Sequence, residues 1–192
     1  MLNGLTLRGI NKKMNHLNQP KKSNNHGFTL IEILIYITMF SLIIGAVVGL
    51  AILATSQRQK NQVLNIVNLQ GESVISIINQ DIDNSSSITS PSLGNSATTL
   101  TLAMPTTAAN PTVFSSYNDG STTHLEISQG SPAVTTYLTN SHVILSNLNF
   151  SNKGLSSTPG SILYSFTLTY KTNSVLQEFN FQKNFYGSAS LL

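Results

Sequence analysis

The stretch from Phe28 to Ser56 contains one charged side chain, the carboxylate of Glu32. The 27 residues from Phe28 to Ala54 would form a helix about 40 Å long, which exceeds the roughly 30 Å of a bilayer's hydrocarbon core. A lone carboxylate in lipid is costly and is usually functional where it occurs. The stretch therefore predicts a membrane-spanning helix over 28–54 and selects Glu32 as a candidate functional residue.

Basic residues are concentrated before this stretch. Residues 1–27 hold five Lys or Arg side chains and no acidic one, whereas the rest of the chain holds five basic and seven acidic residues. The formal net charge of +3 is therefore a property of the first 27 residues. They are typical of a leader on the cytoplasmic side of a membrane. The charge distribution does not support nucleic acid as a partner, and the lack of cysteine excludes disulfides and thiolate metal sites.

An amphipathic pattern continues beyond the apolar stretch, over residues 55–84. From Gln57 onward this segment lacks proline. Its apolar residues recur at helical spacings, with Gly71 between two of them: Leu64, Val67, Val74, Ile78 and Ile82. One apolar stripe on a polar helix is suited to packing on a sheet. We therefore expect one helix from Phe28 to about Ile82, of which the second half lies outside the membrane.

The remaining residues, 85–192, have the pattern of a β-rich globular head. Gly, Pro and Asn separate short alternating runs, which predict strands at 98–104, 124–128, 133–138, 142–150 and 162–170. A turn at 172–174 would lead the last of these into 175–185 as an antiparallel hairpin. The expected fold class is α+β, with a long N-terminal helix packed on an antiparallel β-sheet head.

The segment "HGFTLIE", residues 26–32, is similar to the cleavage site of the type IV prepilin family, which includes the pseudopilins of type II secretion systems. The resemblance covers Gly27 to about Ile52 closely, and the helix-then-sheet layout is similar to the type IV pilin fold. It implies that a prepilin peptidase cuts the bond between Gly27 and Phe28, and that Phe28 is then N-methylated. It also implies that Glu32 serves assembly by meeting the Phe28 amine of a neighbouring subunit.

The resemblance further implies a function. The chain would be a structural subunit of a type IV pilus or a type II secretion-like pseudopilus, a minor pilin or pseudopilin rather than an enzyme, with no cofactor and no metal. It would be stored as a single-pass protein in the bacterial cytoplasmic membrane, with its head extracytoplasmic, and then enter a cell-surface or periplasmic filament. Its partners would be other subunits, the prepilin peptidase, an assembly platform protein and membrane lipid.

Several alternatives stay open at this point. A membrane-anchored extracytoplasmic binding domain that uses a pilin-like anchor is the alternative function. The residues do not separate a pilus from a secretion pseudopilus or a DNA-uptake filament, nor a major from a minor subunit. A leader of 27 residues is long for the family, so the start codon is either Met1 or Met14.

Four other residues of the apolar stretch allow two interpretations, as does Glu32 itself. Glu32 is also suited to capping the helix start, where the helix dipole favours an acid. Gly45 and Gly49 form a Gly-x-x-x-Gly step that permits close helix packing, although small residues are common in membrane helices. Tyr36 and Phe40 could belong to a ligand-binding set, but they are interpreted as packing or interface residues.

Two groups of polar residues outside this stretch resemble metal sites in part. His124 and Glu126 lie two apart on an expected strand, so both would project from one face, and His142 is the other histidine of the head. We expect a solvated sheet face rather than a metal site. Asp81 and Asp83 match the opening of a calcium loop, but the glycine and the later glutamate are missing, so we expect a solvated helix end. The sequence shows no pattern of a catalytic triad, phosphate loop or carboxylate pair.

Overall fold

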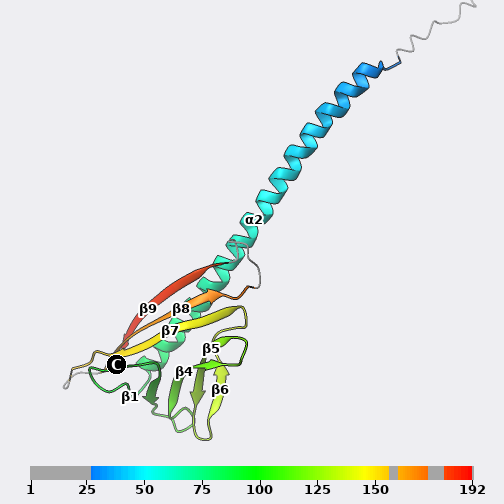
Figure 1. Ribbon diagram of the computed structural model, residues 1–192. Coiled ribbons are helices and arrows are strands. Elements are labelled where there is room, and N and C mark those ends of the chain that lie inside the picture. The colour runs from blue at the N-terminus through cyan, green and yellow to red at the C-terminus, as the bar shows by residue number, and fades with distance from the viewer. Residues whose placement is uncertain (1–26, 156–159, 173–179, 192) are drawn as a thin grey trace, which may run out of the picture. The chain divides into compact units, whose positions relative to one another are not determined.

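The computed structural model of the chain describes residues 27–155, 160–172 and 180–191. The contacts divide the chain into two compact units, Met1–Gly49 and Leu50–Leu192. Helix α2, Leu30–Asp83, contributes residues to both of them (Figure 1). This confirms the expectation of one continuous helix from Phe28 to about Ile82.

In the first unit, α2 presents apolar side chains that the chain itself leaves exposed. Leu30, Phe40 and Leu42 are 83%, 65% and 76% exposed. By its length and composition, the helix can cross a membrane. Apolar surface left in water costs about 25 cal/mol per Å². This part of α2 therefore presents apolar surface that the described part of the chain does not cover.

In the second unit, α2 buries one narrow stripe of residues. The stripe follows helical spacing and consists of Val63, Val67, Gly71, Val74, Ile78 and Ile82. Five of these six were expected from the sequence. The prediction was wrong at Leu64, which is only half-buried. Val63 takes its place because it lies four residues before Val67, directly in line with the stripe.

Two antiparallel sheets form the head, where one had been expected. The first has the order β1-β3-β4-β5-β6 and the second the order β2-β7-β8-β9. The strands of the first sheet are β1 Ser87–Ser90, β3 Leu100–Ala103, β4 Thr112–Asn118, β5 Thr123–Gln129 and β6 Val134–Tyr137. Those of the second are β2 Ser96–Ala97, β7 Val143–Asn152, β8 Ser161–Tyr170 and β9 Gln182–Ser190.

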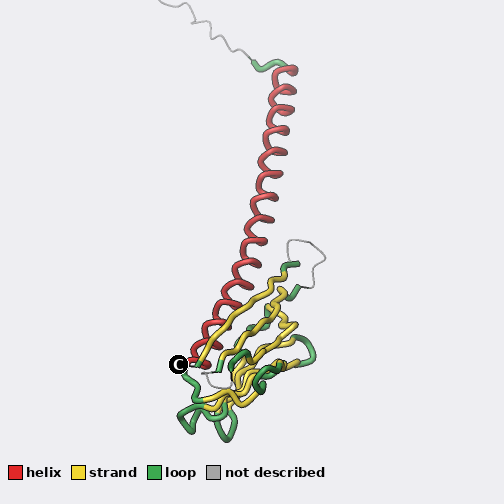
Figure 2. The backbone as a smooth tube through the Cα atoms, turned by 90° about the vertical axis from the view of Figure 1, so that its left-hand side faces the viewer, coloured by secondary structure: helices red, strands yellow, loops and turns green. Residues whose placement is uncertain are grey.

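One hydrophobic core joins the amphipathic part of α2 to both sheets. It contains Ile78 from α2, Phe114 from β4 and Phe166 from β8, each at most 1% exposed. Figure 2 shows the long strands of the second sheet beside this part of the helix. Polar contacts support the packing, since the hydroxyl of Tyr164 on β8 donates to Asn79 Oδ1 on α2 at 2.6 Å. The predicted α+β fold is confirmed.

Two glycines allow α2, β8 and β9 to approach each other closely. A methyl group at Gly71 of α2 would overlap the ring of Phe185 on β9. A methyl group at Gly187 of β9 would likewise overlap the ring of Tyr164 on β8. At both positions an aromatic ring occupies the space that a side chain would need, so the glycines are part of the core packing.

A bulge in β7 changes which of its residues face the core. The register with β8 shifts between Ser146 and Asn149, and Asn147 has a φ of 52°. Before the bulge, Val143 and Leu145 are buried, whereas after it Leu148 and Phe150 are. One extra residue reverses the alternation of a strand. The strand therefore keeps its apolar residues inside although their sequence spacing is irregular.

The strand predictions were confirmed where alternation was strong. The predicted 162–170 corresponds to β8, and its antiparallel partner is β9. That partner begins at Gln182, and residues 173–179 of the predicted hairpin lie outside the described residues. The sequence did not predict β1, β2 or β4. The first two have four and two residues, and β4 carries consecutive serines that obscure its pattern.

Candidate functional site

The candidate site begins at the start of α2, where Thr29 caps the helix. The hydroxyl of Thr29 accepts a hydrogen bond from the backbone N–H of Glu32 at 3.3 Å. The same N–H also donates to the carbonyl oxygen of Thr29 at 3.1 Å, so the hydroxyl and the carbonyl of Thr29 share a donor of the first turn. The spacing of Thr29 and Glu32 is that of a capping box, of which the threonine's half is formed here. The prediction from sequence missed Thr29, although the T-x-x-E spacing indicates this cap.

The side chain of Glu32 has a hydrogen-bond partner one turn further along the helix. The hydroxyl of Tyr36 donates to Glu32 Oε1 at 3.1 Å. The spacing permits this because helical side chains lean toward the N-terminus, so that residue i+4 reaches residue i. Glu32 is half-buried, while its neighbours Ile31 and Ile33 are exposed. The interpretation of Tyr36 as a packing residue was therefore incomplete.

The bond between Gly27 and Phe28 lies just before the helix, in residues that form neither helix nor strand. Phe28 is 72% exposed. A methyl group at Gly27 would meet no atom within 4 Å. The described part of the chain thus leaves this bond uncovered. A protease that needs backbone access would meet no obstruction from these residues.

Gly45 and Gly49 lie on the exposed part of α2. A methyl group at either position would meet no atom within 4 Å. No described contact within the chain therefore requires glycine there, in contrast to Gly71. The Gly-x-x-x-Gly step stays a prediction about packing against another chain.

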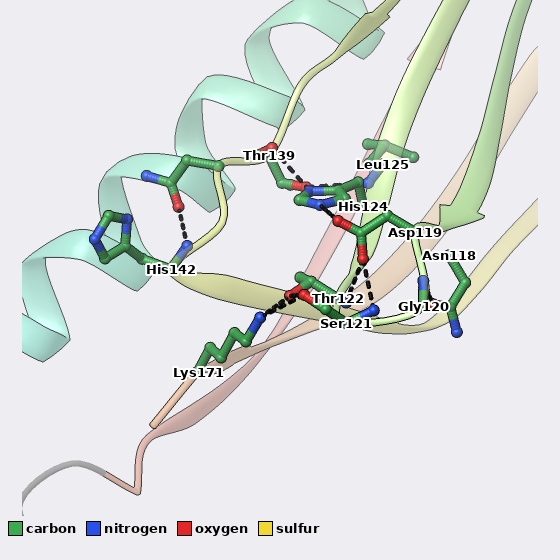
Figure 3. Close-up of polar contacts among 11 residues, drawn as sticks. Asn118, Asp119, Gly120, Ser121, Thr122, His124, Leu125, Thr139, His142 and Lys171 are labelled. Carbon is green, nitrogen blue, oxygen red and sulfur yellow. Dashed lines mark hydrogen bonds and ion pairs between the residues drawn. The ribbon is translucent and has the colours of Figure 1, made fainter. Parts of the chain in front are cut away.

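A second cluster of polar side chains lies in the head, at the turn between β4 and β5 (Figure 3). Asp119 Oδ1 accepts hydrogen bonds from the backbone N–H groups of Ser121 at 2.8 Å and Thr122 at 2.6 Å. These bonds favour the charged carboxylate and lower the pKa of Asp119 below its ordinary value. The ammonium of Lys171 donates to the hydroxyls of Ser121 and Thr122. The turn is thereby joined to the residue that follows β8.

His124 lies beside this turn and is only 5% exposed. Its Nε2 is 3.3 Å from Asp119 Oδ2, and its Nδ1 is 3.2 Å from the carbonyl oxygen of Thr139. Its ring also stacks on that of Tyr137, with 4.9 Å between centroids. Both ring nitrogens therefore face oxygen atoms, and polar contacts hold the ring on both sides. The expected solvated face was wrong for His124, because the β6–β7 region covers it.

The other polar residues considered from the sequence lie apart. Glu126 accepts a hydrogen bond from Ser115 at 2.9 Å, and His142 is exposed. Asp81 is half-buried, and burial raises its pKa, whereas Asp83 is exposed. Within the described ranges, no three or more His, Asp or Glu side chains are placed to share a metal ion.

Two shallow depressions on the head, of about 230 Å³ and about 150 Å³, share Asn147 in their linings. The described residues that line them are apolar or carry hydroxyl and amide groups, and none is Asp, Glu, His, Lys or Arg. They can offer hydrogen bonds from hydroxyl and amide groups.

Comparison with known proteins points to the start of α2. The family model for the prokaryotic N-terminal methylation motif matches residues 22–48. No curated protein matches the chain, and no solved structure does. The match contains Gly27, Phe28 and Glu32 and ends before the head. In its N-terminal segment, the chain carries the signature of type IV prepilins.

Proposed function

We propose that this chain is a structural subunit of a type IV pilus or a type II secretion-like pseudopilus. A prepilin peptidase would cut between Gly27 and Phe28, and the new N-terminus would be methylated. The observation that carries the proposal is the methylation motif over residues 22–48, in which Glu32 lies in the first turn of an exposed apolar helix. This motif favours a structural role over an enzymatic one.

The proposed division of the chain follows from these features. Residues 1–27 would be the leader, 28–54 the membrane span, 55–84 the amphipathic extension and 85–192 the head. Storage in the bacterial cytoplasmic membrane explains why the side chains of the span are left exposed by their own chain. On extraction, helices of other subunits would replace lipid around them, with help from an assembly platform protein.

Glu32 would select the register of assembly. In lipid its carboxylate is costly, and the free amine that cleavage creates at Phe28 is costly as well. When subunits stack, the carboxylate of one can meet the amine of another, and each charge relieves the other. A buried ion pair adds little net stability, but loss of one member costs roughly 3–5 kcal/mol. Such a pair therefore discriminates strongly against misaligned subunits.

The first test is the mass of the protein isolated from its native host. The proposal predicts loss of residues 1–27 and addition of one methyl group, with Phe28 as the new N-terminus. Gly27→Leu should block the cut, because a bulky side chain would obstruct entry of the backbone into a tight site. An N-terminus downstream of Ala54 would instead indicate an ordinary secretory signal and contradict the proposal.

A further inference from the structure

Tyr36 places a hydroxyl on a part of α2 whose neighbouring side chains are mostly apolar. Ile35, Ile37 and Met39 are all exposed, so this surface would face lipid or another subunit. A hydroxyl in such surroundings is unfavourable unless it has a hydrogen-bond partner. The structure gives it one, because the hydroxyl of Tyr36 donates to Glu32 Oε1 at 3.1 Å.

Glu32 is consequently restrained at two points. Its backbone N–H is bonded to the hydroxyl of Thr29, and its carboxylate is bonded to Tyr36. A carboxylate has two oxygens with about four acceptor positions. One bond to Tyr36 therefore fixes the direction of the carboxylate and leaves acceptor positions open for an incoming ammonium group.

We propose that Tyr36 is a positioning residue for Glu32, whose hydroxyl holds the carboxylate of the stored subunit ready for the N-terminal amine of a neighbour. The inference rests on the proposed filament function. In lipid, the phenol supplies a polar partner within the same helix. During assembly, the carboxylate keeps this bond while the neighbour's ammonium binds its free positions, so its side-chain conformation is already selected before the subunits meet.

Packing alone would also give Tyr36 a role, and the two roles differ in what they require. Packing depends on the ring, which Tyr36→Phe retains, whereas positioning depends on the hydroxyl, which this variant removes. Packing is also indifferent to Glu32, whereas positioning acts through it. Thr38→Val is a matched control, because it removes a hydroxyl from the same segment that bonds the carbonyl of Ile35 at 2.8 Å and not Glu32.

The experiment expresses the full chain with its filament system and compares Tyr36→Phe, Thr38→Val, Glu32→Ala and the Glu32→Ala/Tyr36→Phe double variant. Tyr36→Phe should be processed normally and enter sheared filaments about 2- to 10-fold less, the range that one hydrogen bond supports. Thr38→Val should behave as wild type. In the Glu32→Ala background, Tyr36→Phe should cause no further loss. Wild-type incorporation of Tyr36→Phe, or an equal loss in both backgrounds, would overturn the proposal.

A spectroscopic measurement separates this inference from the function on which it rests. Processed protein labelled with ¹³C at the glutamate carboxyls is placed in lipid nanodiscs, and the Glu32 signal is identified by its loss in Glu32→Ala. Tyr36→Phe should shift this signal, and Thr38→Val should not. An unshifted signal contradicts the inference even if Glu32→Ala fails to assemble. Normal assembly of Glu32→Ala contradicts the filament function even if the signal shifts.

Discussion

The two halves of α2 differ in what covers their apolar side chains. In 30–53 the helix is apolar on all sides and its large hydrophobic side chains are exposed. In 63–82 it buries one stripe against the two sheets of its own head. Glycine shows the same contrast, since a methyl group at Gly71 would overlap the ring of Phe185, whereas one at Gly45 or Gly49 would meet no atom within 4 Å beyond its own helical turn. One half packs within the chain, whereas the other leaves its apolar side chains uncovered by the described residues; under the proposed function, lipid or further subunits cover them.

The largest expected effect on the head comes from placing a charge in the buried stripe. Val74 and Ile78 are 0% exposed, so Val74→Asp or Ile78→Asp should lower the stability of the head by several kcal/mol. Ser76→Asp is the matched control, because Ser76 lies between them and is exposed. Thermal unfolding of the full chain in detergent measures both. An unchanged melting temperature in either stripe variant would contradict the assignment of the stripe.

A smaller effect compares glycines in the two halves. Gly71→Ala places a methyl group where the ring of Phe185 lies. The cost should be about 1–3 kcal/mol, reduced by the gain of roughly 1 kcal/mol in helix propensity. The methyl group of Gly49→Ala would meet no atom within 4 Å beyond its own helical turn, so this variant should not destabilise the head. Denaturant unfolding tests both variants, and equal effects would contradict the contrast between the two halves.

The incorporation of Gly49→Ala into filaments tests the same comparison between the two halves of α2. If Gly45 and Gly49 pack against a neighbouring helix, Gly49→Ala should reduce incorporation without changing the unfolding of the head. Normal incorporation would mean that these glycines are only small residues of a membrane helix.

The next effect is a loss of stability of the head at high pH, and it comes from the contact of Tyr164 on β8 with Asn79 on α2. Burial is the main reason that the pKa of Tyr164 is raised to about 12, from an ordinary value of 10.0. The folded head therefore keeps Tyr164 neutral where the unfolded chain ionises it. Its contribution to stability is complete below pH 10 and is lost as the pH rises toward 12.

Tyr164→Phe checks this assignment by urea unfolding between pH 8 and pH 12. The variant should lose about 1 kcal/mol at neutral pH, because Asn79 loses its donor. It should also show a smaller alkaline decline in stability than wild type. An equally steep decline in both proteins would show that Tyr164 is not its source.

The smallest expected effect concerns two carboxylates outside the membrane span, one in the head and one on α2. The pKa of Asp119 is lowered by its backbone hydrogen bonds, so its contribution is present above its ordinary value and is lost as the pH falls through the folded value. Burial raises the pKa of Asp81, so ionisation of Asp81 opposes folding as the pH rises. At pH 7, Asp119→Asn should therefore destabilise the head, while Asp81→Asn should not. Urea unfolding measures both variants. Destabilisation of the head by Asp81→Asn, together with no destabilisation by Asp119→Asn, would contradict the two pKa directions.

The sequence predicted the features that depend on local pattern. The apolar span, the stripe and the strong alternation of β8 depend on periodicity, which is visible in one chain. The residues 26–32 likewise carry the prepilin signature within seven consecutive positions. These features need no knowledge of distant contacts.

What the sequence did not predict depends on contacts that only folding creates. The bulge at Asn147 shifts the core positions of β7, and pairing with β3 and β5 defines β4 as a strand. His124 is buried because the carbonyl of Thr139 and the ring of Tyr137 meet it from a later strand and loop. The i, i+4 spacing of Glu32 and Tyr36 could have predicted the hydrogen bond between them. It was not predicted because an aromatic residue in an apolar helix is usually interpreted as a packing residue.

Under the proposed function, the carboxylate of Glu32 pairs with the Phe28 amine of a neighbouring subunit, and this pair is required for assembly. Incorporation of Glu32→Ala into sheared filaments tests it most directly, with Glu72→Ala, an exposed glutamate in the second half of the same helix, as the control. We predict that Glu32→Ala is inserted and cut after Gly27 but accumulates in the membrane fraction, that Glu32→Asp is intermediate, and that Glu72→Ala assembles normally. Wild-type amounts of Glu32→Ala in the filaments would contradict the claim.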